Sequence, residues 1–312
     1  MDVLTEALGS MRTRHPSAVR TDGRAPWALR LPPVLGAGFH VVLYGTCWLI
    51  PLEDASPHLK PIPLGPGDVV FLRDGRGHIL ADDPASPITE VSAEQPGYCG
   101  PIGSKSLGGN GPQTSLLCGN YHLDQGRAHP LVRQLPEIVH LQARPGRYPE
   151  LTAAVRLLGS ELENPRIGSD GIVLALIDSL LLYILRAWLD DQPAAAAAGW
   201  AAALRDPAVA PALAAIHGDP SAGWTVESLA MQAGLSRAAF ARRFATLVGE
   251  PPLAYLTRWR MTTAAKLLRE SDVPLSTVAA KTGYGSEFAF AKAFKREYGL
   301  PPGGYRHQNS VA

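Results

Sequence analysis

One local sequence pattern occurs twice near the C-terminal end of the chain. A glycine at a turn adopts positive φ, a serine caps a helix, and aromatic residues four positions apart share one helix face. The pattern therefore predicts a helix, a tight turn and a second helix, twice over. The first copy contains Leu229-Ala230, Gly234-Leu235-Ser236, Phe240 and Phe244, and the second contains Val278-Ala279, Gly283-Tyr284-Gly285-Ser286, Phe290 and Phe294. We expect Thr225 and Ser276 to cap the leading helix of each copy.

The segment between the two copies predicts one long helix from Pro251-Pro252 to about Ser271. About 18 residues at 1.5 Å each span roughly 27 Å, which suits a spacer between two helices in successive turns of a DNA major groove. Residues 219–312 carry 12 Lys/Arg and 7 Asp/Glu, whereas residues 1–218 carry 17 and 21. The net charges of +5 and −4 agree with phosphate binding by the C-terminal region. We expect this region to bind double-stranded DNA and the remainder to control it.

The exposed faces of the second helix in each copy supply the predicted DNA contacts. They comprise Ser236, Arg237, Ala238, Ala241, Arg242 and Arg243 in the first copy, and Ser286, Glu287, Phe288, Ala289, Lys292, Lys295 and Arg296 in the second. Arginines can reach guanine edges and phosphates, whereas the alanines offer only methyl contact with thymine. The alternatives are that the arginines form a solvated basic face and that Glu287 only stabilises its helix N-terminus.

The N-terminal half has a sequence pattern typical of a β-protein. After an irregular or weakly helical leader over residues 1–26, short β-type runs at 39–44, 47–51, 69–72 and 116–118 alternate with turns rich in Gly, Pro and Asp. Strands of this length and spacing predict a small barrel or jelly roll.

A histidine pattern in this half resembles a known fold. Gly67-Asp68, Gly75 and His78 resemble the second signature of the cupin fold, and His40 lies where the first would begin. Metal-binding cupins supply a further His, but Val42 stands there, and two imidazoles are too few for a transition-metal site. We therefore expect no metal and no cofactor, and we expect a small organic effector inside the barrel. The predicted effector-binding residues are His40, Trp48, Phe71 and His78.

Two other functions remain open for the N-terminal half. A metal-dependent cupin enzyme would need further ligands from among His58, His122, His129 and His140. A thiol-based redox sensor would use Cys47, Cys99 or Cys118, although two of these lie in predicted strands and suit small buried hydrophobes.

A helical region follows. Leu151, Val155, Leu158 and Leu162 form a stripe over 149–164, and residues 169–190 are apolar on two sides. The two-sided surface predicts a homodimer interface, with packing against the barrel alone as the alternative. Changing Leu176 and Leu180 to Glu should then give a folded monomer. Asp178 and Arg186 argue against a membrane span, and the N-terminus lacks a signal-peptide pattern, so a cytoplasmic protein is expected.

The C-terminal motifs resemble the signature of the AraC/XylS family of bacterial transcriptional regulators over about 206–306. The matching residues are Gly283-Tyr284, Ser286-Glu287, Phe290, Lys292, Phe294-Lys295-Arg296, Pro301-Pro302 and Tyr305-Arg306. The resemblance implies a non-enzymatic α+β regulator. Its parts would be a cupin-like β-barrel sensor (1–148), a helical dimerisation segment (149–190), a linker (191–206), an all-α domain of two helix–turn–helix units joined by a long helix (207–306) and a tail (307–312). Implied partners are double-stranded DNA, a second copy of the chain, a small-molecule effector and RNA polymerase.

Overall fold

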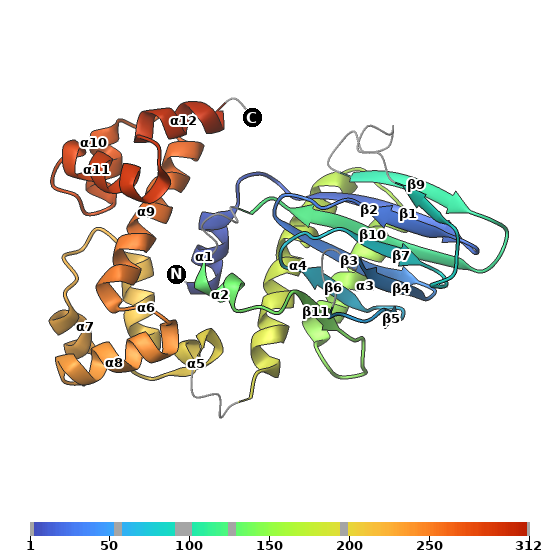
Figure 1. Cartoon of the computed structure of the whole chain (residues 1–312), viewed down its shortest axis with the longest axis horizontal. Coiled ribbons are helices and arrows are strands. Elements are labelled where there is room, and N and C mark those ends of the chain that lie inside the picture. The colour runs from blue at the N-terminus through green and yellow to red at the C-terminus, as the bar shows by residue number, and fades with distance from the viewer. Residues whose placement is uncertain (1–2, 53–57, 91–101, 124–128, 194–198, 311–312) are drawn as a thin grey trace. The chain divides into compact units, whose positions relative to one another are not determined.

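The computed structural model describes residues 3–52, 58–90, 102–123, 129–193 and 199–310 (Figure 1). Its contacts divide the chain into two units. The β-rich unit comprises Arg14–Gly126 and Leu135–Asp191, and the helical unit comprises Met1–Thr13, Arg127–Gln134 and Gln192–Ala312. The helical unit thus takes two segments from the N-terminal half, which differs from the consecutive domains expected from the sequence.

Two sheets form the β-rich unit. The first has the order β11-β6-β3-β10-β1-β9, and the second has the order β5-β4-β7-β2-β8. The first contains β1 (Ser17–Arg24), β3 (Ala37–Tyr44), β6 (Val69–Leu72), β9 (Ile102–Gly108), β10 (Gln113–Tyr121) and β11 (Ile138–Leu141). The second contains β2 (Ala28–Leu31), β4 (Cys47–Pro51), β5 (Ile62–Leu64), β7 (His78–Ala81) and β8 (Ile88–Glu90). The four predicted β-type runs correspond to β3, β4, β6 and β10.

The predicted irregular leader is wrong for residues 17–24, which form β1 between β9 and β10. In the second half of β1 the charged residues Arg20, Asp22 and Arg24 alternate with Thr21 and Gly23, so the strand lacks the Val/Ile/aromatic density that marks a strand. Arg20 and Asp22 form an ion pair at 3.1 Å on the polar face of the strand. Pairing with neighbours on both sides, rather than intrinsic propensity, stabilises this strand.

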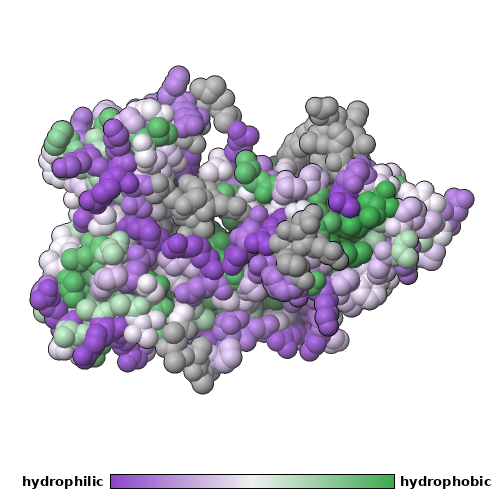
Figure 2. Space-filling view, viewed as in Figure 1, coloured by the Kyte–Doolittle hydropathy of each residue, from purple (hydrophilic) through white to green (hydrophobic). Residues whose placement is uncertain are grey.

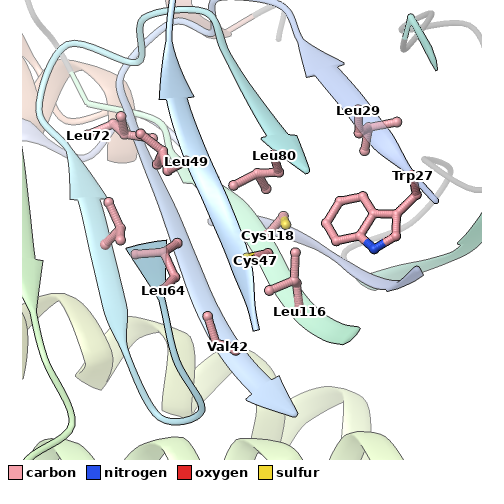
Figure 3. Close-up of a cluster of buried hydrophobic side chains, with 11 residues drawn as sticks. Trp27, Leu29, Val42, Cys47, Leu49, Leu64, Leu72, Leu80, Leu116 and Cys118 are labelled. Carbon is pink, nitrogen blue, oxygen red and sulfur yellow. The ribbon is translucent and has the colours of Figure 1, made fainter. Parts of the chain in front are cut away.

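Apolar side chains from both sheets fill the interior between them. Figure 3 shows this cluster, which consists of Trp27, Leu29, Val42, Cys47, Leu49, Leu64, Val70, Leu72, Leu80, Leu116 and Cys118. Alternate residues of each strand point inward, and Cys47 and Leu49 of β4 both belong to the cluster, whereas Trp48 between them does not.

Helices α3 (Pro149–Glu163) and α4 (Ser169–Asp191) pack on each other and against the first sheet. The Tyr121 hydroxyl of β10 donates a 2.7 Å hydrogen bond to the Ile177 carbonyl of α4. By length and composition α4 could cross a membrane. In the structure, Val173, Ile177 and Leu181 of this helix are buried within the β-rich unit.

The helical unit contains both copies of the repeated pattern. It consists of α1 (Val3–Met11), α2 (Pro130–Arg133), α5 (Trp200–Arg205), α6 (Val209–Gly218), α7 (Val226–Gln232), α8 (Arg237–Val248), α9 (Pro252–Glu270), α10 (Leu275–Lys281), α11 (Glu287–Tyr298) and α12 (Pro302–Ser310). Helix α5 occupies part of the predicted linker, and α12 extends into the predicted tail. The expected cap at Ser276 is wrong, since the N-cap is Pro274, α10 begins at Leu275, and no side chain caps it.

The two segments from the N-terminal half are built into the helical unit. Helix α1 packs against α6 and α9, and the Arg269 guanidinium of α9 donates to the carbonyls of Ser10 at 2.9 Å and Arg12 at 3.2 Å. The backbone N–H of His129, just before α2, contacts the Met11 sulfur at 2.9 Å. These contacts are long-range in sequence, so local patterning does not reveal them.

Candidate functional sites

Both copies of the repeated pattern form a helix–turn–helix with the same turn glycine and the same serine cap. Gly234 and Gly283 adopt φ of 65° and 76° at the two turns, where a side chain would be strained. Ser236 caps α8 by accepting from Ala239 N–H at 3.3 Å, and Ser286 caps α11 by accepting from Ala289 N–H at 3.2 Å. Thr225 caps α7 through a capping box with Ser228, as the sequence predicts.

The aromatic residues of both copies face the core. Phe240, Phe244, Phe290 and Phe294 are each 0% exposed. Phe244 meets the Tyr255 ring of α9 at 5.8 Å, and Phe294 meets the Tyr305 ring of α12 at 5.3 Å. With the aromatic face buried, the opposite face of each second helix is left to solvent.

The residues predicted to contact DNA lie on these solvent faces. All thirteen are exposed except Ala241, which is half-buried. Hydrophilic residues cover much of the helical unit on the face shown in Figure 2. Both faces are therefore open to solvent within the helical unit.

The three arginines of α8 differ in what they already bind. Arg237 pairs with exposed Glu227 at 2.7 Å. Arg243 pairs with Asp206 at 2.5 Å, and the other oxygen of this carboxylate accepts from Ala208 and Val209 N–H groups at the start of α6. Arg242 forms no ion pair among the residues that the structure describes. Its guanidinium is therefore the α8 cation most readily offered to a partner.

Helix α11 carries a different surface. Lys292 and Lys295 are exposed and form no ion pair within the described part of the chain. Phe288 is 80% exposed in the first turn of the helix. An exposed aromatic ring beside lysines suits apolar contact with bases together with charge contact to phosphates.

A buried polar cluster lies at the start of α9. The Tyr255 hydroxyl is hydrogen-bonded to His129 Nε2 at 3.0 Å and to His217 Nε2 of α6, while the His217 ring stacks on Trp259 at 3.8 Å. Burial holds the pKa of His129 well below its usual range, with Arg258 contributing. The cluster therefore joins α2, α6 and α9 through shared hydrogen bonds.

The β-rich unit contains a cavity of about 230 Å³ between its two sheets. Its wall includes Ser17, Ala18, Val19, Thr21, Leu31, Pro32, Val34, Gly38, His40, Leu72, Gly75, His78, Cys118, Gly119 and Asn120. His40 comes from β3 of the first sheet and His78 from β7 of the second, and their Nε2 atoms are 2.7 Å apart. The histidine pair thus links the two sheets at the cavity wall.

Only two of the four predicted effector residues line this cavity. Phe71 precedes the cavity-lining Leu72, so strand alternation turns its ring to the opposite face, where it meets Tyr121 at 6.4 Å. Trp48 alternates with the core-facing Cys47 and Leu49 and therefore points out of the interior. The expectation that all four residues share one cavity is thus corrected for Phe71 and Trp48.

The histidine pair does not fit a metal ion. Two nitrogens each about 2.0–2.1 Å from a tetrahedral ion would be roughly 3.3 Å apart, which exceeds the observed 2.7 Å. No group of three or more His, Cys, Asp or Glu suited to a metal occurs among the described residues. His140 instead bonds to Asp68 at 2.9 Å, and His129 lies in the helical unit.

Two of the cysteines are poorly suited to thiol chemistry. Burial raises the pKa of Cys47 and of Cys118 to about 12, so little thiolate exists at neutral pH. Cys99 lies outside the described residues. The redox-sensor alternative therefore has little support from Cys47 and Cys118.

Comparison with known proteins agrees with this geometry. Residues 2–190 match a family model described as Cupin, and residues 229–308 match one described as Helix-turn-helix domain. The chain is 36% identical to an AraC-like transcription regulator of Streptomyces lividans over 98% of both chains. It is 30% identical to the HTH-type transcriptional regulator MtrA of Neisseria gonorrhoeae over 99% of both. Among solved structures, the DNA-binding domain of AdpA in complex with a target DNA is 36% identical over 34% of this chain and 95% of that chain, with a TM-score of 0.32.

Proposed function

The chain belongs to the AraC-like transcription regulators with an N-terminal cupin domain, and we propose that it binds its operator through α8 and α11 under the control of a small effector in the β-rich unit. The observation that carries the proposal is the pair of capped, exposed second helices joined by the single helix α9. Nineteen residues make α9 about 28 Å long. Such a spacer suits two helices reading successive major-groove turns of one DNA duplex, about 34 Å apart.

In the proposed complex α8 and α11 make different kinds of contact with DNA. Arg242 of α8 is the unpaired long donor and reads a guanine, while Arg237 and Arg243 reach phosphates or position the helix. On α11, Lys292, Lys295 and Arg296 neutralise phosphates, and Phe288 contacts a thymine methyl. Ser236, Ser286, Ala238, Ala241, Ala289 and Glu287 complete the two surfaces.

Selection of bound duplexes from a random pool tests this function, because it identifies the preferred DNA sequence directly. We expect a consensus of two segments about one helical turn, roughly 10 base pairs, apart on one DNA face. The double variant Arg242→Ala/Lys292→Ala should lose enrichment, whereas Arg144→Ala, an exposed arginine of the β-rich unit, should retain it. Enrichment by the double variant equal to that of the wild type would refute the assignment to α8 and α11.

We also propose a homodimer through exposed apolar residues of α3 and α4. Leu157 is 56% exposed on α3 and Ile172 is 45% exposed on α4. Leu180 is 0% exposed, so the test suggested by the sequence is corrected: a glutamate at 180 would unfold the unit rather than separate two copies. Leu157→Glu/Ile172→Glu should instead give a folded monomer by sedimentation, with Leu35→Glu, 89% exposed elsewhere, as the control. A wild type that is monomeric at micromolar concentration would contradict the proposal.

The remaining parts of the proposal concern the effector site, a further protein partner and the location in the cell. The cavity beside His40 and His78 is the proposed effector site, since residues of both sheets line it. Strand β1 follows α1 in the sequence, and β10 precedes α2. Two strands that line the cavity are therefore adjacent in sequence to segments of the helical unit. RNA polymerase is the proposed further partner, and the cytoplasm is the proposed location.

A further inference from the structure

A side chain near the middle of α9 bridges the two helix–turn–helix units. The Arg260 guanidinium donates from Nε to the Pro220 carbonyl at 2.7 Å and from Nη2 to the Ala222 carbonyl at 2.9 Å. Both carbonyls belong to the loop between α6 and α7, which leads into the first unit. Because the donor is charged, these are among the stronger hydrogen bonds that a backbone carbonyl accepts. Arg260 therefore ties α9 to the entrance of the first unit.

The loop that accepts these bonds is itself folded. The Asp219 carboxylate accepts from the backbone N–H groups of Ser221 at 3.0 Å and Ala222 at 3.2 Å, which is the pattern of an Asx turn. The Trp224 indole N–H donates to the Asp219 carbonyl at 2.8 Å and closes the loop. The loop thus presents its carbonyls to Arg260 from a defined shape.

The same guanidinium lies against the turn of the second unit. A Cβ added at Gly283 would lie 2.7 Å from Nη2 and 2.9 Å from Cζ of Arg260, and 2.9 Å from the Ser221 carbonyl oxygen. All three distances are shorter than a Cβ tolerates. The turn therefore leaves no room for even one methyl group. The loop of the first unit, the α9 side chain and the turn of the second unit meet at Arg260.

The matching turn of the first unit has no such contact. Gly234 occupies the equivalent position with φ of 65°, close to the 76° of Gly283. Apart from its chain neighbours, no described atom lies within 4 Å of a Cβ added at Gly234. Both glycines supply a positive φ, but of the two only Gly283 also makes space for a neighbour. The repeat thus separates the contact with Arg260 from the needs of the turn itself.

From these contacts we infer that Arg260 is a positioning residue that fixes the rotation of α8 relative to α11 and so restricts the operator to one spacing of its two segments. Helix α9 sets the distance between its own ends, whereas a bridge from its middle opposes rotation of either unit about its end. Two sites held in fixed geometry bind best at one matched spacing, and freely jointed sites tolerate several. The inference rests on the proposed DNA reading by α8 and α11 and adds what determines the spacing.

Operators with altered spacing test the inference with the full-length chain. Each base pair inserted between the two segments rotates one of them by about 35° around the DNA axis. We expect the wild type to bind the selected spacing at least about tenfold more tightly than one changed by two base pairs. In Arg260→Ala this spacing ratio should fall to about threefold or less, because the two units are no longer held in one rotation.

Two controls separate positioning from other roles of an arginine on α9. Arg258 lies on the same helix and bonds to Glu250, so Arg258→Ala should keep the wild-type spacing ratio. Loss of a phosphate contact would weaken binding at every spacing and lower the slope of log K against log salt by about one unit, whereas loss of the bridge should leave the slope unchanged. Arg260→Lys, which keeps a charged donor, should restore part of the ratio.

The two turn glycines supply a test that does not require Arg260→Ala to fold. Gly234→Ala and Gly283→Ala impose the same positive φ on an alanine. Only the second also displaces Arg260 and the loop that it holds. We therefore expect Gly283→Ala to lower the spacing ratio and Gly234→Ala to keep it.

The outcomes distinguish this inference from the proposal beneath it. A wild-type spacing ratio in Arg260→Ala, or equal ratios in the two glycine variants, would overturn the positioning role while leaving DNA reading by α8 and α11 intact. A lower salt slope with equal losses at every spacing would overturn it in favour of a phosphate contact. A wild type that selects no two-segment consensus would remove the DNA-reading proposal and this inference together.

Discussion

The two helix–turn–helix units share a backbone plan but present different surfaces. Turn glycine, serine cap and buried phenylalanine pair recur in both. Helix α8, however, carries three arginines, of which two are held in ion pairs, whereas α11 carries lysines and an exposed phenylalanine. The cores differ as well, since the first unit includes the buried His129–Tyr255–His217 cluster and the second packs Phe294 against Tyr298 and Tyr305. A duplicated scaffold can thus be retained while each copy acquires its own contacts.

The largest effect should come from the buried phenylalanines, which occupy matching positions in the two helix–turn–helix units. Phe244→Ala and Phe294→Ala should each lower the free energy of unfolding by about 3–5 kcal/mol, because both rings are fully buried and leave cavities. Phe288→Ala, whose ring is 80% exposed, should change it by less than about 0.5 kcal/mol. Urea unfolding measures all three. A large difference between the two core variants would mean that the units are not structurally equivalent.

The next effect concerns DNA reading, where the two units should differ. Arg242→Ala should cost about 1–3 kcal/mol of binding free energy and blur the consensus at one or two base pairs. Lys292→Ala should weaken binding to all sequences alike and reduce the slope of log K against log salt by about one unit. Competition with single-base operator variants distinguishes these outcomes. If Lys292→Ala changes base preference while Arg242→Ala does not, the proposed roles are reversed.

Acid should destabilise the first helix–turn–helix unit more than the second. The pKa of His129 is lowered by burial, so the unfolded chain binds its proton before the folded one does as the pH falls. The stability that depends on neutral His129 is complete above about pH 6.5 and decreases below it, by at most about 1.4 kcal/mol per pH unit. Hydrogen exchange at pH 7 and pH 5 should show greater loss of protection in α8 than in α11. His129→Phe should reduce this difference, and unchanged protection in α8 would contradict the role of the cluster.

The smallest effect should come from the exposed pair between Arg237 and Glu227. Both side chains are more than half exposed, and exposed pairs contribute about 0–1 kcal/mol. Glu227→Gln should therefore leave the unfolding free energy almost unchanged. It should raise DNA affinity modestly, since Arg237 is released and a negative charge near the phosphates is lost. Glu163→Gln, which changes an exposed glutamate of α3, is the control for the change in net charge. If the two variants bind DNA with equal affinity, Arg237 does not contact DNA.

Local interactions explain why so much of the helical unit was predictable. The caps at Thr225, Ser236 and Ser286 and the turns at Gly234 and Gly283 depend on residues within four positions of each other. Ser276 was assigned wrongly because Pro274 supplies the helix start without a side-chain cap. Four strands, β3, β4, β6 and β10, were also predicted from their apolar sequence, whereas β1 was not, because its stability depends on pairing with β9 and β10.

The sequence by itself determined the duplicated helix–turn–helix, its exposed faces and the strand-rich character of the first half, since helical and strand periodicities are written in neighbouring residues. Only the tertiary structure decided that His40 and His78 meet across two sheets, that Phe71 faces away from the cavity, and that α1 and Pro130–Arg133 belong to the helical unit. These features depend on which side of a strand a residue occupies and on contacts between residues far apart in the chain. Such contacts are set by packing of the whole unit, so no local pattern specifies them.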